Sequence, residues 1–176
     1  MSGSYPHGSY GWWKANYAFD AEYAKVCQVL AGMGWDVSYT EIDHFPPDST
    51  YAGGFANVAY EMKPAFPLIY PLHQPKSGQS YGGGYATSSK SSNLAKEYRS
   101  ILTGSMQGGD FFAAMKQDLI DKMNLALHAT SSNKSGTAGQ RTLFNNLLRP
   151  AVDLARQNGW ISEMQHFELL SLLYNG

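Results

Sequence analysis

The chain has 176 residues and a formal net charge of −1 at pH 7, with 43% hydrophobic but only 15% charged residues. This length and composition are typical of one folded domain with its own core, and they exclude a disordered chain. The near-neutral charge excludes a cationic shell, so contacts with nucleic acid would depend on locally placed Lys and Arg. No apolar run reaches the roughly 18 residues of a membrane span, and we predict no association with a membrane.

The N-terminal segment, residues 1–18, is an aromatic arm with the sequence MSGSYPHGSYGWWKANYA. It lacks the basic start and apolar middle of a secretory signal. If the protein is secreted or delivered to a target cell, we therefore expect a route without a classical signal peptide. Two interpretations of the arm remain open: its rings stack on bases or on a partner protein, or they pack the segment onto the body of the protein.

The next elements are a helix and a strand. Tyr23, Val26 and Leu30 recur at helical spacing and predict a helix over residues 20–32. Cys27, the only cysteine, lies in the same pattern, which excludes an internal disulfide and is typical of a buried structural thiol. The following segment WDVSYTEID, residues 35–43, alternates as a strand does.

The second half of the chain is predicted to be helical. One helix begins near Asn93, a second follows Asp110 as its N-cap, and a third follows a capping box formed by Thr137 and Gln140. Pro150 is expected to kink or divide the third helix. The final helix is predicted to bury a stripe made of Met164, Phe167, Leu170 and Leu173.

These elements predict an α+β fold in a single domain covering residues 1–176. The arm is followed by a strand and loop half, residues 19–92, and by a helical half, residues 93–176. We expect a small β-hairpin and loop that carry a metal site to pack on a mainly helical scaffold.

Residues that suit hydrolytic chemistry stand where the predicted strand ends, in EIDHFPPDSTYAGG, residues 41–54. Hydrolysis of a phosphodiester needs a general base for water and a divalent cation that neutralises the developing charge. We assign these roles to His44 as base and Asp43 as metal ligand. Adjacent strand residues point to opposite faces, so the chain must turn after the strand, as Pro46 and Pro47 would make it do. The Asn57 amide is predicted to hold the loop backbone.

His73 is predicted to complete the metal site. An imidazole together with a carboxylate and several waters suits Mg, Mn or Zn. An ordinary turn after a strand, with a hydrogen-bonded histidine, explains Asp43-His44 as well. For His73, the alternative is a loop histidine bonded to the backbone.

A glycine-rich segment follows, and it has two interpretations as well. Its backbone amides at Tyr81, Gly82 and Gly83 could cradle a phosphate, or the segment is a flexible linker. Lys76 and Lys90 belong to a lysine series without intervening acids, which could follow a nucleic-acid backbone or merely form a solvated face.

Taken together, these residues resemble the HNH, or His-Me finger, nuclease motif. EIDHFPPDSTYAGGFAN is similar to a strand that ends in Asp-His, with Pro47, a glycine pair and Asn57 behind it. The histidine followed by Ser-Tyr-Gly-Gly is similar to domains of bacterial polymorphic toxins and effectors. The chain departs from these patterns: it has no zinc-binding cysteines nearby, and Gly84-Tyr85 stands where the toxin domains have Arg-Asn.

The resemblance covers residues 37–125, roughly half of the chain. It implies a metal-dependent endonuclease, a hydrolase of DNA or RNA, delivered as a toxin into the cytoplasm of a competitor and neutralised at home by an immunity protein. A second hypothesis comes from the residues themselves: a non-enzymatic secreted effector or accessory protein that binds a protein partner through the aromatic arm and the glycine-rich loop.

Overall fold

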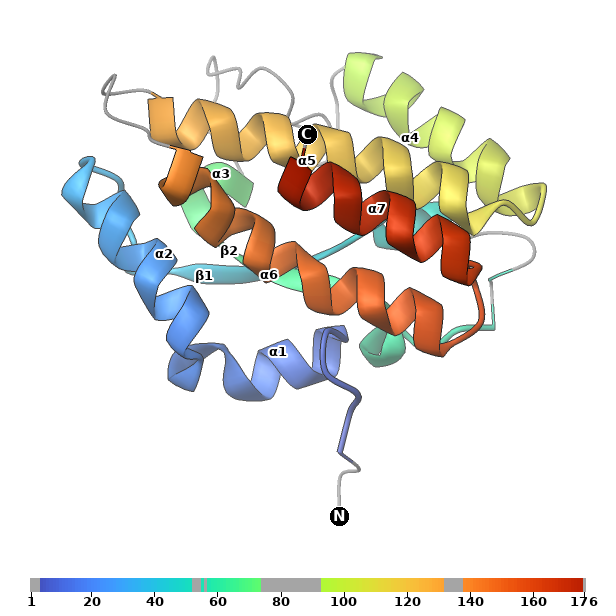
Figure 1. Ribbon diagram of the computed structural model, residues 1–176, viewed down its shortest axis with the longest axis horizontal. Helices are drawn as coiled ribbons and strands as arrows, with labels where there is room; N and C mark the ends of the chain where they lie inside the picture. The colour runs from blue at the N-terminus through green and yellow to red at the C-terminus, as the bar shows by residue number, and fades with distance from the viewer. Residues whose placement is uncertain (1–3, 52–54, 56, 74–92, 132–137, 176) are drawn as a thin grey trace.

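The computed structural model describes residues 4–51, 55, 57–73, 93–131 and 138–175, and these are mostly helical with one two-stranded antiparallel sheet. This confirms the α+β class. Long helices lie side by side across the molecule, with the sheet beside them (Figure 1). The helices are α1 (Tyr10–Asn16), α2 (Ala21–Gly32), α3 (Tyr70–His73), α4 (Asn93–Gln107), α5 (Phe111–Ser131), α6 (Ala138–Gln157) and α7 (Glu163–Asn175), with 3₁₀ turns η1 (Tyr17–Phe19), η2 (Asp48–Thr50) and η4 (Tyr60–Met62).

The sheet pairs β1 (Thr40–His44) with β2 (Ala65–Ile69), so that His44 lies opposite Ala65 and Asp43 opposite Phe66. Strand β2 is buried along its whole length. The strand predicted over residues 35–43 is therefore displaced: it begins later and includes His44. The reason is that a five-residue partner strand leaves residues 35–39 without a ladder to join.

The aromatic arm is folded onto the body. Ser9 caps α1, its Oγ accepting from the Trp12 amide at 3.3 Å, and the Trp13 ring is 1% exposed. The Tyr10 amide donates to the Lys63 carbonyl at 2.9 Å. A Cβ on Gly8, which has a φ of +91°, would lie 2.3 Å from the backbone oxygen of α6 at Pro150, so the segment has room only for glycine there. The structure thus favours the packing interpretation of the arm.

Helix α2 matches its prediction. Asp20 is the N-cap, its Oδ1 accepting from the Tyr23 amide at 2.8 Å. Tyr23, Val26 and Leu30 are buried in the core, while Cys27 is only partly buried. The apolar spacing in the sequence therefore identified the face that packs.

Helices α5 and α6 also follow their patterns. Asp110 caps α5, its Oδ1 accepting from the Ala113 amide at 3.0 Å. Pro150 lies inside α6, which continues as one helix on both sides of it, so of the two predicted alternatives the division is wrong and the kink stays a prediction. Thr137, one half of the predicted capping box, lies outside the described residues.

The predicted buried stripe of α7 is wrong. Met164 is 81% and Phe167 is 71% exposed, whereas Leu169 and Leu173 are buried. Four residues spaced by three drift backwards by about 60° per step around a helix with 3.6 residues per turn, so they do not share one face. Leu169 and Leu173, four residues apart, do share one.

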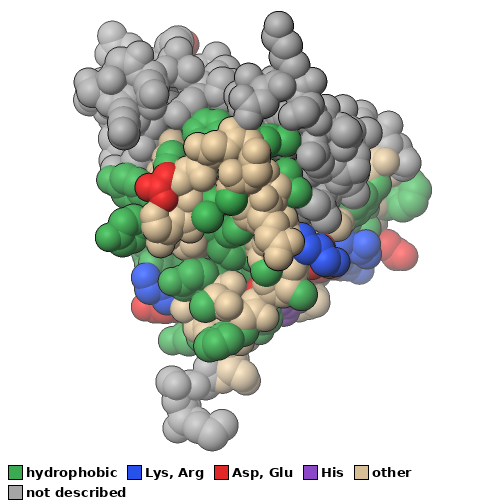
Figure 2. Space-filling view, turned by 90° about the vertical axis from the view of Figure 1, so that its left-hand side faces the viewer, with side chains coloured by type: hydrophobic (Ala, Val, Ile, Leu, Met, Phe, Trp, Pro, Cys, Tyr) green, Lys and Arg blue, Asp and Glu red, His purple; other side chains and the backbone are tan. Residues whose placement is uncertain are grey.

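The surface is consistent with the low charged fraction. Figure 2 shows one face of the molecule, on which hydrophobic side chains in green lie among tan backbone and other side chains, and charged side chains are few. Within the described residues, no helix is both long enough and apolar enough to span a membrane.

Candidate active site

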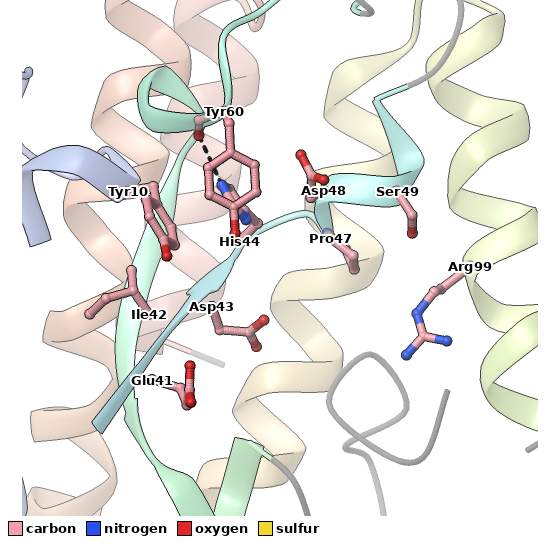
Figure 3. A pocket seen from close by; sticks show the side chains of 10 residues that line it. All are labelled: Tyr10, Glu41, Ile42, Asp43, His44, Pro47, Asp48, Ser49, Tyr60 and Arg99. Atoms are coloured by element: carbon pink, nitrogen blue, oxygen red, sulfur yellow. Dashed lines mark hydrogen bonds between the residues drawn. The ribbon is translucent and has the colours of Figure 1, made fainter. Parts of the chain in front are cut away.

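The end of β1 borders a cavity of about 350 Å³. Strand β2 pairs with one edge of β1, and the cavity lies along the other edge, between β1 and α4 (Figure 3). A space at the edge of a strand is open to side chains from both faces of that strand. Asp43 and His44 therefore both line the cavity, although they are adjacent. The lining is formed by Tyr10, Glu41, Ile42, Asp43, His44, Pro47, Asp48, Ser49, Tyr60 and Arg99.

The turn after the strand follows from the two prolines. The Phe45–Pro46 peptide is cis, and residues 48–50 form the 3₁₀ turn η2. Thr50 closes this turn, its amide and hydroxyl both donating to the Pro47 carbonyl, at 3.0 and 2.6 Å. The phenyl ring of Phe45 is fully buried and anchors the bend. The expected change of chain direction after Asp43-His44 is thus present.

The His44 imidazole is held on three sides. The ring stacks on Tyr10 with centroids 4.7 Å apart and an interplanar angle of 8°. Tyr60 meets it edge-on at 4.3 Å. Its Nε2 lies 3.0 Å from the Tyr60 carbonyl oxygen. These contacts leave the ring little freedom to rotate, so Nε2 stays the nitrogen that faces the Tyr60 carbonyl.

The tautomer of His44 follows from the Tyr60 contact. A carbonyl oxygen can only accept, so Nε2 carries the hydrogen and Nδ1 carries the lone pair. Burial lowers the pKa of His44 below its ordinary value, although the carbonyl of Tyr60 and the acids Asp48 and Asp43 act in the opposite direction. The ring is therefore neutral at pH 7, and its Nδ1 can accept a proton.

Three carboxylates line the cavity with His44. Asp48 is bound by the Lys63 ammonium, Nζ to Oδ1 2.5 Å. The lysine, which is 8% exposed, also lies over the Tyr51 ring at 4.8 Å. The Lys63 side chain thus pairs with Asp48 and packs against the core, and it is not part of an exposed basic surface. Glu41 and Asp43 are the carboxylates on the strand itself.

Glu41 and Asp43 could hold a divalent cation. In the part of the chain that the structure describes, no group of three or more His, Cys, Asp or Glu side chains is arranged around a metal position. Carboxylate oxygens from one or two residues, completed by water and substrate phosphate, are how Mg²⁺ is commonly bound. The donor set therefore fits a hard, oxygen-preferring cation such as Mg²⁺ or Mn²⁺ better than a protein cage for Zn²⁺.

The sequence pattern identified Asp43 and His44 as site residues, but not Glu41, Tyr60, Arg99 or Tyr10, which line the same cavity. Arg99 comes from α4 and faces the acids of β1 across the space (Figure 3). A guanidinium is the side chain best suited to a phosphate oxygen. Tyr10 comes from α1. Because both lie more than thirty positions from the Asp43-His44 pair along the chain, no local spacing could have linked them to it.

The other predicted site residues are not brought to this cavity by the described structure. Asn57 is exposed in a turn and does not line the cavity. His73 is the last residue of α3, and its side chain is not described. The remaining predictions lie outside the described residues: Lys76, Tyr81, Gly82, Gly83 and Lys90.

Comparison with known proteins adds no identification. No family model, curated protein sequence or solved structure matches the chain.

Proposed function

We propose that the chain is a metal-dependent nuclease that hydrolyses phosphodiester bonds in DNA or RNA. The observation that carries this proposal is the neutral, immobilised imidazole of His44, with Asp43 and Arg99 lining the same cavity. Metal-dependent phosphodiester hydrolysis uses a base for water and a carboxylate for a cation, and a guanidinium is well suited to hold the phosphate.

Each group has one role in the proposed mechanism. His44 Nδ1 takes the proton of the attacking water while Nε2 donates to the Tyr60 carbonyl, which stabilises the imidazolium that forms. Arg99 binds a non-bridging oxygen of the scissile phosphate and keeps it in the cavity. Asp43, with Glu41, would hold Mg²⁺ or Mn²⁺. Such a cation, when bound, neutralises charge on the phosphate and its leaving group.

The biological setting rests on the resemblance alone. A His-Me finger nuclease of the polymorphic-toxin type would be delivered to a target cell, would act in the cytoplasm and would be neutralised by an immunity protein. His73, Asn57 and the Tyr81–Gly83 segment stay predictions of that resemblance, with Lys76 and Lys90 as candidate backbone contacts.

The interaction-protein hypothesis has less support. It relies on the aromatic arm and the glycine-rich loop as binding surfaces. Trp13 of the arm is buried in the core and Tyr10 is stacked on His44, while the glycine-rich loop lies outside the described residues. Those rings are therefore engaged within the protein itself.

The experiment is cleavage of plasmid DNA and total RNA by the purified protein with Mg²⁺, Mn²⁺ or Zn²⁺, with EDTA as the metal-free control. We expect cutting with Mg²⁺ or Mn²⁺ that is lost in His44→Ala. His166→Ala is a matched control, because His166 also bonds through Nε2, to Asp153 at 2.7 Å, but on α7 away from the cavity. If neither polymer is cut with any of the metals, the nuclease proposal fails.

A further inference from the structure

A buried charged network links α4 to α5 behind the cavity. The Tyr98 hydroxyl of α4 donates to Asp118 Oδ1 of α5 at 2.9 Å. The Lys122 ammonium, one turn along α5, donates to the same oxygen at 3.1 Å and to Asp121 Oδ2 at 3.3 Å. Asp118 is 0% and Lys122 is 2% exposed. The active site as described uses none of these groups.

Such a network is costly to bury. Taking charges out of water commonly offsets their mutual attraction, so a buried ion pair is weak evidence of a contribution to stability. Burial also raises the pKa of Tyr98, so its hydroxyl stays protonated and acts as the donor to Asp118. Ionisable groups whose pKa values are strongly shifted by burial cluster at functional sites.

The position that this network fixes is that of α4. Its described buried residues are Tyr98, Leu102 and Met106, which form one face at four-residue spacing against the core. Tyr98 is the first of them, so its bond to Asp118 anchors the N-terminal half of the described helix. Arg99, the next residue, points about 100° away around the helix and lines the cavity.

We propose that Tyr98 is a positioning residue for Arg99: its hydroxyl bond to Asp118 holds α4 at the distance from β1 at which the guanidinium meets a substrate phosphate. Lys122 and Asp121 keep the accepting carboxylate in place. This inference rests on the proposed function, because it takes Arg99 to be the phosphate contact.

The test measures binding and not turnover. A fluorescein-labelled single-stranded oligonucleotide is titrated by anisotropy, in Mg²⁺, with protein that carries His44→Ala and so cannot use its base. In this background Arg99→Ala is expected to weaken binding about tenfold or more, as for loss of a charge-assisted phosphate contact. Tyr98→Phe, which removes only the hydroxyl, is expected to weaken binding about three- to tenfold.

A double variant separates positioning from general damage. If Tyr98 acts through Arg99, Tyr98→Phe adds no further loss of affinity to Arg99→Ala. Tyr174→Phe is the matched control, because that hydroxyl also donates to a side-chain oxygen, Asn146 Oδ1 at 2.8 Å, but on α7. It should leave the affinity unchanged. Thermal unfolding of each variant verifies that the compared proteins are folded at the assay temperature.

The outcomes are distinct. Loss of affinity in Arg99→Ala with unchanged affinity in Tyr98→Phe overturns the inference and leaves the proposed function standing. Additive losses in the double variant also overturn it. If the parent protein binds no oligonucleotide, the proposed role of Arg99 fails, and both proposals fail with it.

Discussion

Lys122→Met is the substitution that probes the buried network most severely. The ammonium is the cation that the structure pairs with both Asp118 and Asp121, at 3.1 and 3.3 Å, and all three side chains are at most 4% exposed. Removing it leaves two buried carboxylates without that counter-charge. Breaking a buried pair by removing one partner costs about 3–5 kcal/mol. Because 1 kcal/mol shifts Tm by about 2–4 °C in a chain of this size, we expect a fall of roughly 6–20 °C.

The assay is thermal and urea unfolding followed by circular dichroism. Lys116→Met is the surface control, since its pair with Glu168 at 2.6 Å joins side chains that are 40% and 49% exposed. That change should cost no more than about 1 kcal/mol. A triple variant, Asp118→Asn with Asp121→Asn and Lys122→Met, removes the charges of these three side chains and should recover most of the loss, since it leaves no uncompensated charge among them. The Asp43 carboxylate, which also interacts with Lys122, keeps its charge in the single and the triple variant.

Two results would refute this reasoning. A loss in Lys122→Met as small as in Lys116→Met would mean that water reaches the network. A triple variant as unstable as the single one would mean that the loss came from packing of the lysine stem and not from buried charge.

The remaining predictions concern the site and the core. Tyr10→Ala should lower kcat about tenfold by releasing the His44 ring, whereas Tyr10→Phe keeps the stacked ring and most of the activity, as steady-state kinetics would test. Because burial lowers the pKa of His44 below 6.5, kcat/KM should rise with pH and be half-maximal at a pH below 6.5; a half-maximal pH above 6.5 would contradict this. Asp43→Asn should raise the Mg²⁺ concentration for half-maximal cleavage by about tenfold or more, and Asn57→Ala should change it little. Trp13→Ala should cost about 3–5 kcal/mol in urea unfolding if the arm is part of the core.

The sequence identified the elements whose signals are local. The apolar spacing of α2 and the cap Asp110 of α5 were sufficient, because local signals and burial agree there. The stripe of α7 failed because its four residues, spaced by three, do not share one face of a helix, and because the exposed Met164 and Phe167 are as hydrophobic as the buried leucines.

The candidate site was only partly predictable. Asp43 and His44 were recognisable as a pair, because two functional side chains at a strand end followed by prolines form a local pattern. Arg99 and Tyr10 reach the same cavity only through the packing of α4 and α1, which depends on long-range contacts. The burial of Lys63 could not be predicted from the local sequence either, since its partner Asp48 lies fifteen positions away along the chain.

Chemical rescue of His44→Ala is the sharpest test of His44 as the general base. His44→Ala opens a space between Tyr10 and Tyr60 the size of the lost imidazole. The account predicts that His44→Ala does not cleave a Mg²⁺-loaded oligonucleotide substrate, and that added imidazole restores cleavage in proportion to its neutral form. Cleavage by His44→Ala at the wild-type rate, without imidazole, would contradict the account.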